Sequence, residues 1–143
     1  ASVLAASAGA VEYTVASCAE LADVDDTVVT SLVITASPFA CDSYTRFRVR
    51  NTMVLSSTEA EVVFSNFALK VLGELTVDPD VVFKDVVDQV KNGGALYVAA
   101  GATATFNGET LFENNSIFSK DLPDYEYKIK KGGAIHNKAR IEH

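Results

Sequence analysis

The feature that most constrains the fold is an internal repeat in the second half of the chain. Residues 69–85 and 96–114 both contain three short apolar segments, separated by a glycine turn and then a polar turn. A repeat of roughly 20–50 residues indicates units that bury their apolar faces by stacking on one another. Two residues inserted near Gly101 explain why two offsets relate the units. The offset is 27 for Leu69 and Val71 with Leu96 and Val98 (96 − 69 = 27), and 29 for Thr76 and Phe83 with Thr105 and Phe112 (112 − 83 = 29).

The segments themselves have the pattern of strands. Apolar and polar residues alternate within them, which places one set of side chains on a buried face. The sequences Asp78-Pro79-Asp80 and Asn107-Gly108-Glu109 are typical of turns. Short strands and tight turns that recur every ~20–30 residues favour a stacked solenoid over the alternative, an antiparallel sandwich. The side chains expected to point inward are Leu69, Val71, Leu75, Val77, Val82, Phe83, Leu96, Val98, Ala104, Phe106, Leu111 and Phe112.

A second marker is a Gly-Gly-Ala turn that precedes an aliphatic residue. It occurs at 93–96 and at 132–135, with a Phe-x-x-Asn sequence at 112–115 between the two copies. The spacing between the copies (132 − 93 = 39) predicts a loop insertion at about residues 117–131. Paired glycines adopt backbone angles that other residues avoid, and they let stacked coils approach closely. The motif residues are Gly93, Gly94, Ala95, Phe112, Asn115, Gly132, Gly133 and Ala134.

These paired motifs resemble the repeats of the polymorphic outer membrane proteins (Pmp) of chlamydiae, which also occur in extracellular proteins of algae and stramenopiles. The resemblance extends over residues 62–143, with degenerate Phe-x-x-Asn copies at 64–67 and 83–86. It implies a right-handed parallel β-helix and roles in adhesion and surface display. The expected fold is therefore all-β: a short right-handed parallel β-helix (solenoid) with a small N-terminal helical cap.

The sequence of the N-terminal third indicates that the same domain begins there. Ser17 and Glu20 fit a capping box, which predicts a short helix at 18–22 that covers the first coil. We expect one domain over residues 1–143, with an extension and cap at 1–27 and coils at 28–143. The last coil has no cap in the sequence, so we expect another chain, a loop or further residues to cover it. Further strands are expected at 28–36, 44–50, 53–55 and 61–64.

The chain has two cysteines, Cys18 and Cys41, which would lie one coil apart. In an oxidising compartment they would close a loop of about 23 residues, worth about 3 kcal/mol by chain entropy. The alternative is a pair of buried free thiols. Two cysteines with no nearby histidine are too few for a metal site.

Charge and hydropathy exclude several classes of partner. The net charge is −7, so the chain repels phosphate backbones and we expect no nucleic acid partner. No apolar stretch reaches the ~18–20 residues of a membrane-spanning helix, so we expect no span of its own. The small residues at 1–10 are typical of an end left after a targeting segment is removed, or of a fragment boundary. We expect an exported or imported protein, in the extracellular space, at the cell surface or in an organelle lumen such as a plastid.

The sequence shows no pattern typical of catalysis, so we expect no catalytic residue, cofactor or resident metal. His136 and His143 have no partner at metal-ligand spacing, and the cluster Asp23, Asp25 and Asp26 lacks the glycine and glutamate of a calcium loop. Nucleophile elbows and phosphate-binding glycine loops are also missing from the sequence.

One charged pattern is a candidate contact site. Arg46, Arg48 and Arg50 alternate on one expected strand and form a stripe suited to an anionic glycan or a carboxylate-rich partner. The alternative is an ordinary solvent-exposed face of the strand.

Three functions compete at this stage. The first is a non-catalytic structural or protein-interaction module, such as a surface adhesin-like fragment. The second is a carbohydrate-binding or carbohydrate-active protein, which two carboxylates across a cleft would favour. The third is an accessory subunit of a larger complex, an organellar membrane complex among them. Other protein subunits are the favoured partners, and glycans are the alternative.

Overall fold

The computed structural model describes residues 2–7, 10–86, 95–113, 135–137 and 140–142. Most of these residues lie in β-strands, as the alternating pattern predicts. The helix in these ranges is a short 3-10 helix, η1 (Cys18–Asp23). The strands are β1 (Ser2–Ser7), β2 (Ala10–Val15), β3 (Ser31–Ile34), β4 (Phe39–Val49), β5 (Thr52–Ser57), β6 (Glu61–Val71), β7 (Glu74–Val77), β8 (Asp80–Lys84), β9 (Leu96–Val98), β10 (Thr103–Phe106), β11 (Thr110–Glu113), β12 (Ile135–Asn137) and β13 (Arg140–Glu142).

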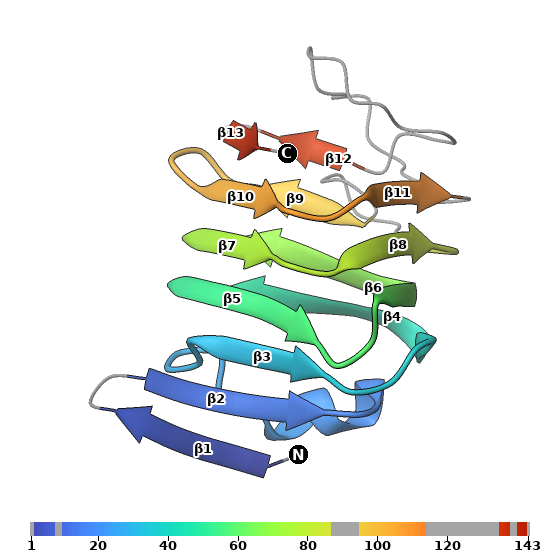
Figure 1. Ribbon diagram of the computed structural model, residues 1–143. Coiled ribbons are helices and arrows are strands. Elements are labelled where there is room, and N and C mark those ends of the chain that lie inside the picture. Colours follow the sequence, from blue (N-terminus) through green and yellow to red (C-terminus); the bar gives the residue numbers. More distant parts are fainter. Residues whose placement is uncertain (1, 8–9, 87–94, 114–134, 138–139, 143) are drawn as a thin grey trace.

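The strands form two sheets, and in both sheets the strands are stacked along the same direction (Figure 1). The seven-stranded sheet has the order β1-β2-β3-β5-β7-β10-β13. The six-stranded sheet has the order β11-β8-β6-β9-β12, and β4 also pairs with β6. Neighbouring strands run parallel except β1 and β2, which are antiparallel. The prediction of parallel β structure is confirmed, and the alternative of an antiparallel sandwich is wrong.

The six-stranded sheet turns a corner inside β6. The first half of this strand pairs with β8 and the second half pairs with β9. Between the halves lies Asn66, whose φ of 57° is in the left-handed region that asparagine tolerates better than most residues. The chain therefore makes three straight segments between Thr52 and Val71. They pair in order with β7, β8 and β9 of the next unit.

The strand register confirms both predicted repeat offsets. Leu69 pairs with Leu96 and Phe83 pairs with Phe112, which are the pairs that the two offsets predict. The additional residues of the longer offset lie in the turn between β9 and β10. In this turn the Ala102 N–H donates to the Ala99 carbonyl at 3.0 Å, and Gly101 has a φ of 83°. The repeat thus defines which residues of successive units lie side by side.

A column of phenylalanines runs through the core. Phe39, Phe64, Phe83 and Phe112 come from four strands that pair in register. The rings of Phe64 and Phe83 stack with centroids 5.2 Å apart, and those of Phe83 and Phe112 with centroids 5.4 Å apart. Phe39 meets Phe64 edge-on at 5.6 Å. Offset and edge-to-face rings add to the stabilisation from burial, so this column joins the units through their interior.

Eleven of the twelve predicted inward side chains are buried, and ten of these belong to the core cluster. Leu111 is half-buried, and Val82 is 7% exposed but lies outside the core cluster. The reason is the period of two along a strand: because Phe83 points inward, Val81 does so as well and Val82 points outward. Val81 is 1% exposed and belongs to the core.

The N-terminal elements differ in detail from the expectation. The helix is of the 3-10 type, and the Ser17 side chain forms no capping hydrogen bond. Glu20 does reach back, since its Oε1 accepts a hydrogen bond from the Ala16 N–H at 2.7 Å. The strand expected at 44–50 begins earlier, at Phe39, and the one expected at 61–64 extends to Val71. Both extensions arise because β4 and β6 pair on both sides of the corner, with a register shift between Ala40 and Thr45.

The turn between β6 and β7 leaves room for glycine alone. A Cβ atom on Gly73 would lie 2.5 Å from the carbonyl oxygen of Asn51 in the preceding unit. We expect Gly73→Ala to lower the free energy of unfolding by about 2 kcal/mol, because the neighbouring backbone has to move. Urea unfolding of both proteins measures this difference. Leu72→Ala, at the exposed preceding residue, is the control and should change stability by less than about 1 kcal/mol. Equal stability of the Gly73→Ala variant and the parent would contradict the close approach.

Candidate functional site: a cationic face and an adjoining groove

Basic side chains gather on the outward surface of β4 and the second half of β6, beside an aromatic side chain of β9. Core residues alternate along these strands with the outward residues Arg46, Arg48, Lys70 and Tyr97. The register aligns Arg48 with Lys70, and Lys70 with Tyr97. We name these four residues, together with Tyr44, the cationic face.

Two of its three cations lie against aromatic rings. The Arg46 Nε donates a hydrogen bond to the Tyr44 hydroxyl at 2.9 Å, and its Cζ is 5.7 Å from the centre of that ring. The Lys70 Nζ is 5.5 Å from the centre of the Tyr97 ring. Such cation–π contacts orient a charge without neutralising it. Arg48 is exposed and has no ion pair among the described residues. Arg48 therefore presents its positive charge to solvent.

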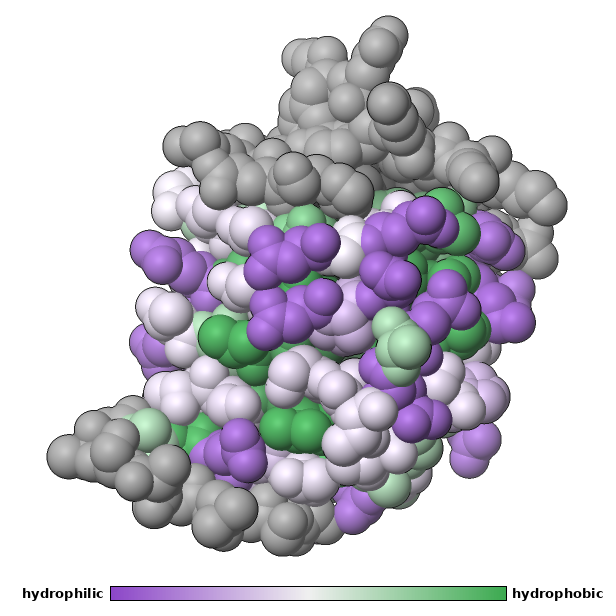
Figure 2. Space-filling model, in the orientation of Figure 1, coloured by the Kyte–Doolittle hydropathy of each residue, from purple (hydrophilic) through white to green (hydrophobic). Residues whose placement is uncertain are grey.

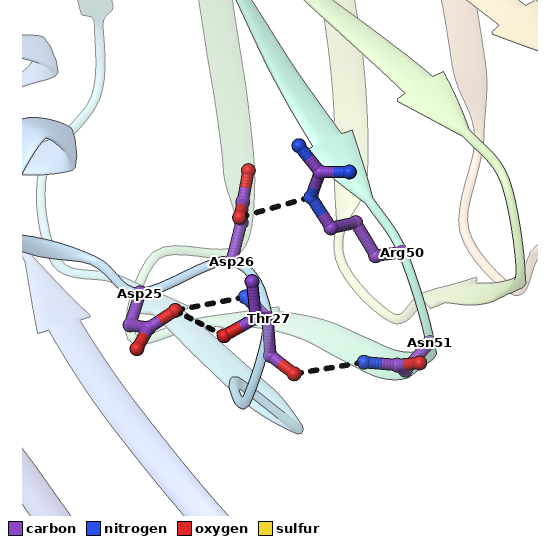
Figure 3. Close-up of polar contacts among 5 residues, drawn as sticks. All are labelled: Asp25, Asp26, Thr27, Arg50 and Asn51. Atoms are coloured by element: carbon purple, nitrogen blue, oxygen red, sulfur yellow. Dashed lines mark hydrogen bonds and ion pairs between the residues drawn. The ribbon is translucent and has the colours of Figure 1, made fainter.

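The third arginine of the predicted stripe has a different role. Arg50 Nε lies 3.0 Å from Asp26 Oδ1, and this ion pair joins the end of β4 to the turn that precedes β3 (Figure 3). The adjacent Asn51 Nδ2 donates to the Thr27 carbonyl at 2.9 Å. The structure thus keeps Arg46 and Arg48 on one surface and holds Arg50 at a corner between units.

The same turn is ordered by a local carboxylate. Asp25 Oδ1 accepts hydrogen bonds from the Thr27 hydroxyl at 2.6 Å and from the Thr27 N–H at 3.0 Å (Figure 3). The hydroxyl, followed by the N–H, holds the pKa of Asp25 below its usual value because both stabilise the ionised form. These hydrogen bonds fix the conformation of the turn that precedes β3.

Cys18 of η1 and Cys41 of β4 form a disulfide in the structure, with a Cα–Cα distance of 5.3 Å. It ties the helix to the first strand of the six-stranded sheet. Leu21 is the buried residue of the helix and packs into the core. The helix and the strand are therefore joined both covalently and by apolar contact.

A groove of about 580 Å³ lies between η1 and β4. Leu21 and Phe47 are among its apolar residues, and the polar ones include Asp26, Asp42, Arg46 and Arg48. Because Arg46 and Arg48 also belong to the cationic face, the groove and the face are one continuous surface. No pattern in the sequence predicts the groove, since it depends on how the helix packs against β4.

The seven-stranded sheet presents a different surface. Its outward residues on β3, β5, β7 and β10 include Ser31, Val33, Val54, Thr76 and Thr105, which the register aligns in rows. Figure 2 shows the molecule from this side, where near-neutral and apolar residues predominate over β3 and β5. The described cations Arg46, Arg48 and Lys70 are instead gathered on strands of the other sheet.

The predicted repeat motif can be compared with the structure at two positions. Ala95 is fully buried, and Phe112 is 5% exposed in the phenylalanine column. Gly93, Gly94, Asn115, Gly132, Gly133, Ala134, the insertion at 117–131 and His143 lie outside the described residues.

The structure reveals a motif that the sequence reasoning missed. The left-handed residues Asn66 and Asp85 each lie two positions after a column phenylalanine, with φ values of 57° and 55°. The next position holds the fully buried Phe67 and Val86. In these two units the corner signal is therefore Phe-x-Asn/Asp followed by an apolar residue, which the sequence at 64–67 and 83–86 already contained.

Neither a metal site nor a membrane helix is found in the described part of the chain. No group of three or more histidine, cysteine, aspartate or glutamate side chains is placed there to hold a metal ion. In the same ranges no helix has both the length and the apolar character to cross a bilayer.

Comparison with known proteins supports the resemblance to the Pmp repeats. Residues 109–138 match the family model of the Chlamydia polymorphic membrane protein (Pmp) repeat. The match contains β11, β12 and the sequence from Phe112-Glu113-Asn114-Asn115 to Gly132-Gly133-Ala134-Ile135. No curated protein and no solved structure matches the chain. The chain thus carries a Pmp-type repeat at residues 109–138.

Proposed function

We propose that this chain, which carries a Pmp-type repeat, is a non-catalytic interaction module built as a short right-handed parallel β-helix with three strands per turn. Support for the fold comes from the parallel pairing of three successive segments with their counterparts in the next unit. Such stacking presents long, regular outer surfaces that suit contacts with other macromolecules.

The observation that carries the proposal is the cationic face. The chain has a net charge of −7, yet three cations lie on two adjacent strands beside two aromatic rings. Exposed arginine and aromatic residues are enriched in the contact surfaces of proteins. An acidic partner is favoured because the charge of these side chains opposes that of the whole chain.

The partner that we propose is another protein subunit with an acidic surface. The module would then act as an accessory subunit of a larger complex, such as an organellar membrane complex, or as an adhesin-like element at a cell surface. Both settings agree with an exported or imported protein whose disulfide forms in an oxidising compartment.

A charge-reversal experiment tests this function. The full chain, the double variant Arg48→Glu/Lys70→Glu and the control Lys84→Glu on β8 are immobilised and exposed to native extract, and retained proteins are identified by mass spectrometry. We expect a set of proteins that the parent and the Lys84→Glu control retain and that the double variant loses, because reversed charges repel an acidic partner. Retention of the same set by all three would reject the cationic face as the contact surface.

The second candidate is carbohydrate binding, and the groove favours it. An apolar floor with a few charged groups at the rim is typical of small-molecule and saccharide sites. A carbohydrate-active enzyme would in addition need two carboxylates placed across the cleft. Of the two groove carboxylates, Asp26 is held by Arg50 at the corner between units.

A further inference from the structure

The cationic face contains a straight column that crosses the strands. Arg48, Lys70 and Tyr97 occupy paired positions on β4, β6 and β9. Neighbouring strands lie about 4.8 Å apart, so the three side chains leave the surface at regular intervals along the stacking direction. The column is therefore linear, and its repeat is that of the sheet.

The chemistry along the column suits a polymer of anionic rings. The planar guanidinium of Arg48 binds carboxylates and sulfates through two parallel hydrogen bonds, and the Lys70 ammonium supplies a second charge. Tyr97 adds an aromatic ring beside this charge. At one end of the column Arg48 also lines the groove, whose carboxylates Asp26 and Asp42 would repel an anionic chain.

We propose that this column binds a linear acidic polysaccharide, made of uronic acid or sulfated sugar residues, that runs across β4, β6 and β9. This inference rests on the part of the proposed function that takes the cationic face as the contact surface, and it assigns that surface to an acidic glycan, the second candidate, in place of an acidic protein.

The aromatic residue of the column favours a glycan over an acidic peptide. Lys70 Nζ lies 5.5 Å from the centre of the Tyr97 ring. A sugar residue can therefore place its anionic group at the Lys70 ammonium while its ring contacts the tyrosine, whereas an aspartate or glutamate side chain offers the ammonium a charge but offers the tyrosine no ring.

Calorimetric titration of the full chain with four probes tests the inference. The probes are an oligogalacturonate, a heparin-derived oligosaccharide, a neutral oligosaccharide of equal length and polyglutamate of equal charge. We expect the two acidic glycans to bind about tenfold or more tightly than polyglutamate, and the neutral one not to bind. Binding by one acidic glycan alone supports the proposal and identifies the anionic group as carboxylate or sulfate.

Variants locate the site. Arg48→Gln/Lys70→Gln should weaken glycan binding by about tenfold or more, whereas the control Lys84→Gln on β8 should leave it unchanged. Tyr97→Ala should weaken binding of the glycans but not of polyglutamate, because an aromatic ring contributes to contact with sugar rings. A folded state for each variant is checked by circular dichroism.

The outcomes separate this inference from the proposed function. If polyglutamate binds as tightly as the glycans and the double variant loses it, the cationic face stands as a contact surface and the glycan assignment is overturned. If no acidic probe binds and the extract experiment also shows no dependence on Arg48 and Lys70, both are overturned. Equal glycan binding by the parent and the double variant would show that the column is not the binding site.

Discussion

Replacing Phe64 with alanine is expected to lower the free energy of unfolding by about 4 kcal/mol, enough to remove much of the stability of a typical domain. The ring is fully buried and lies within 5.6 Å, centroid to centroid, of Phe39, Phe67 and Phe83. Its loss opens a cavity at the centre of the phenylalanine column, where rigid rings on several sides limit collapse. Urea unfolding followed by circular dichroism measures the change.

Two further variants test whether the loss of stability comes from the loss of the buried ring. Phe64→Leu keeps most of the buried volume and should be destabilised by clearly less than the alanine variant. Val63→Ala changes the adjacent outward residue, which is half-buried, and should have a smaller effect still. A Phe64→Ala protein that unfolds at the same urea concentration as Val63→Ala would show that the column does not hold the units together.

Removal of the disulfide is expected to have the next largest effect. The double variant Cys18→Ser/Cys41→Ser should be less stable by about 3 kcal/mol, because the bridge closes a loop with a sequence separation of 23 residues and restricts the unfolded chain. Thermal and urea unfolding of the variant and the oxidised parent give the difference.

The parent treated with a reductant is the matched control for this variant. Reduction should bring the parent to the stability of the double serine variant, since both then lack the same constraint. The groove should also change, because η1 is tied to β4 by this bridge and Cys18 is among the groove residues. Equal unfolding midpoints with and without reductant would contradict a stabilising disulfide.

Much of the strand arrangement followed from local pattern. The two repeat offsets correctly paired Leu69 with Leu96 and Phe83 with Phe112, because the period of an alternating strand allows few registers that keep one face apolar. The same period was misapplied at Val82 and Leu111, where two adjacent residues were both expected to point inward. The corner residues Asn66 and Asp85 were missed because one left-handed residue leaves a weak signal in a sequence.

The candidate site was only partly predictable. Arg46 and Arg48 were recognised from their alternation, but Arg50 shares that alternation and forms an ion pair with Asp26 at a corner. Lys70 and Tyr97 were not recognised as site residues, although the offset that pairs Leu69 with Leu96 also aligns them. The step that was missing was to apply the register to outward residues as well as to core residues.

By itself the sequence determined the strand content, the parallel stacking of repeated units and the register between them, because the burial of alternating apolar residues is a local property that repeats along the chain. The tertiary structure alone decided the surface: which arginine is held in an ion pair, where Lys70 meets Tyr97, and the groove between η1 and β4. These features depend on side chains from different units, which are distant in the sequence and are brought together only when the units stack. Outward positions accept many residue types, so no local pattern reveals which of them will act together.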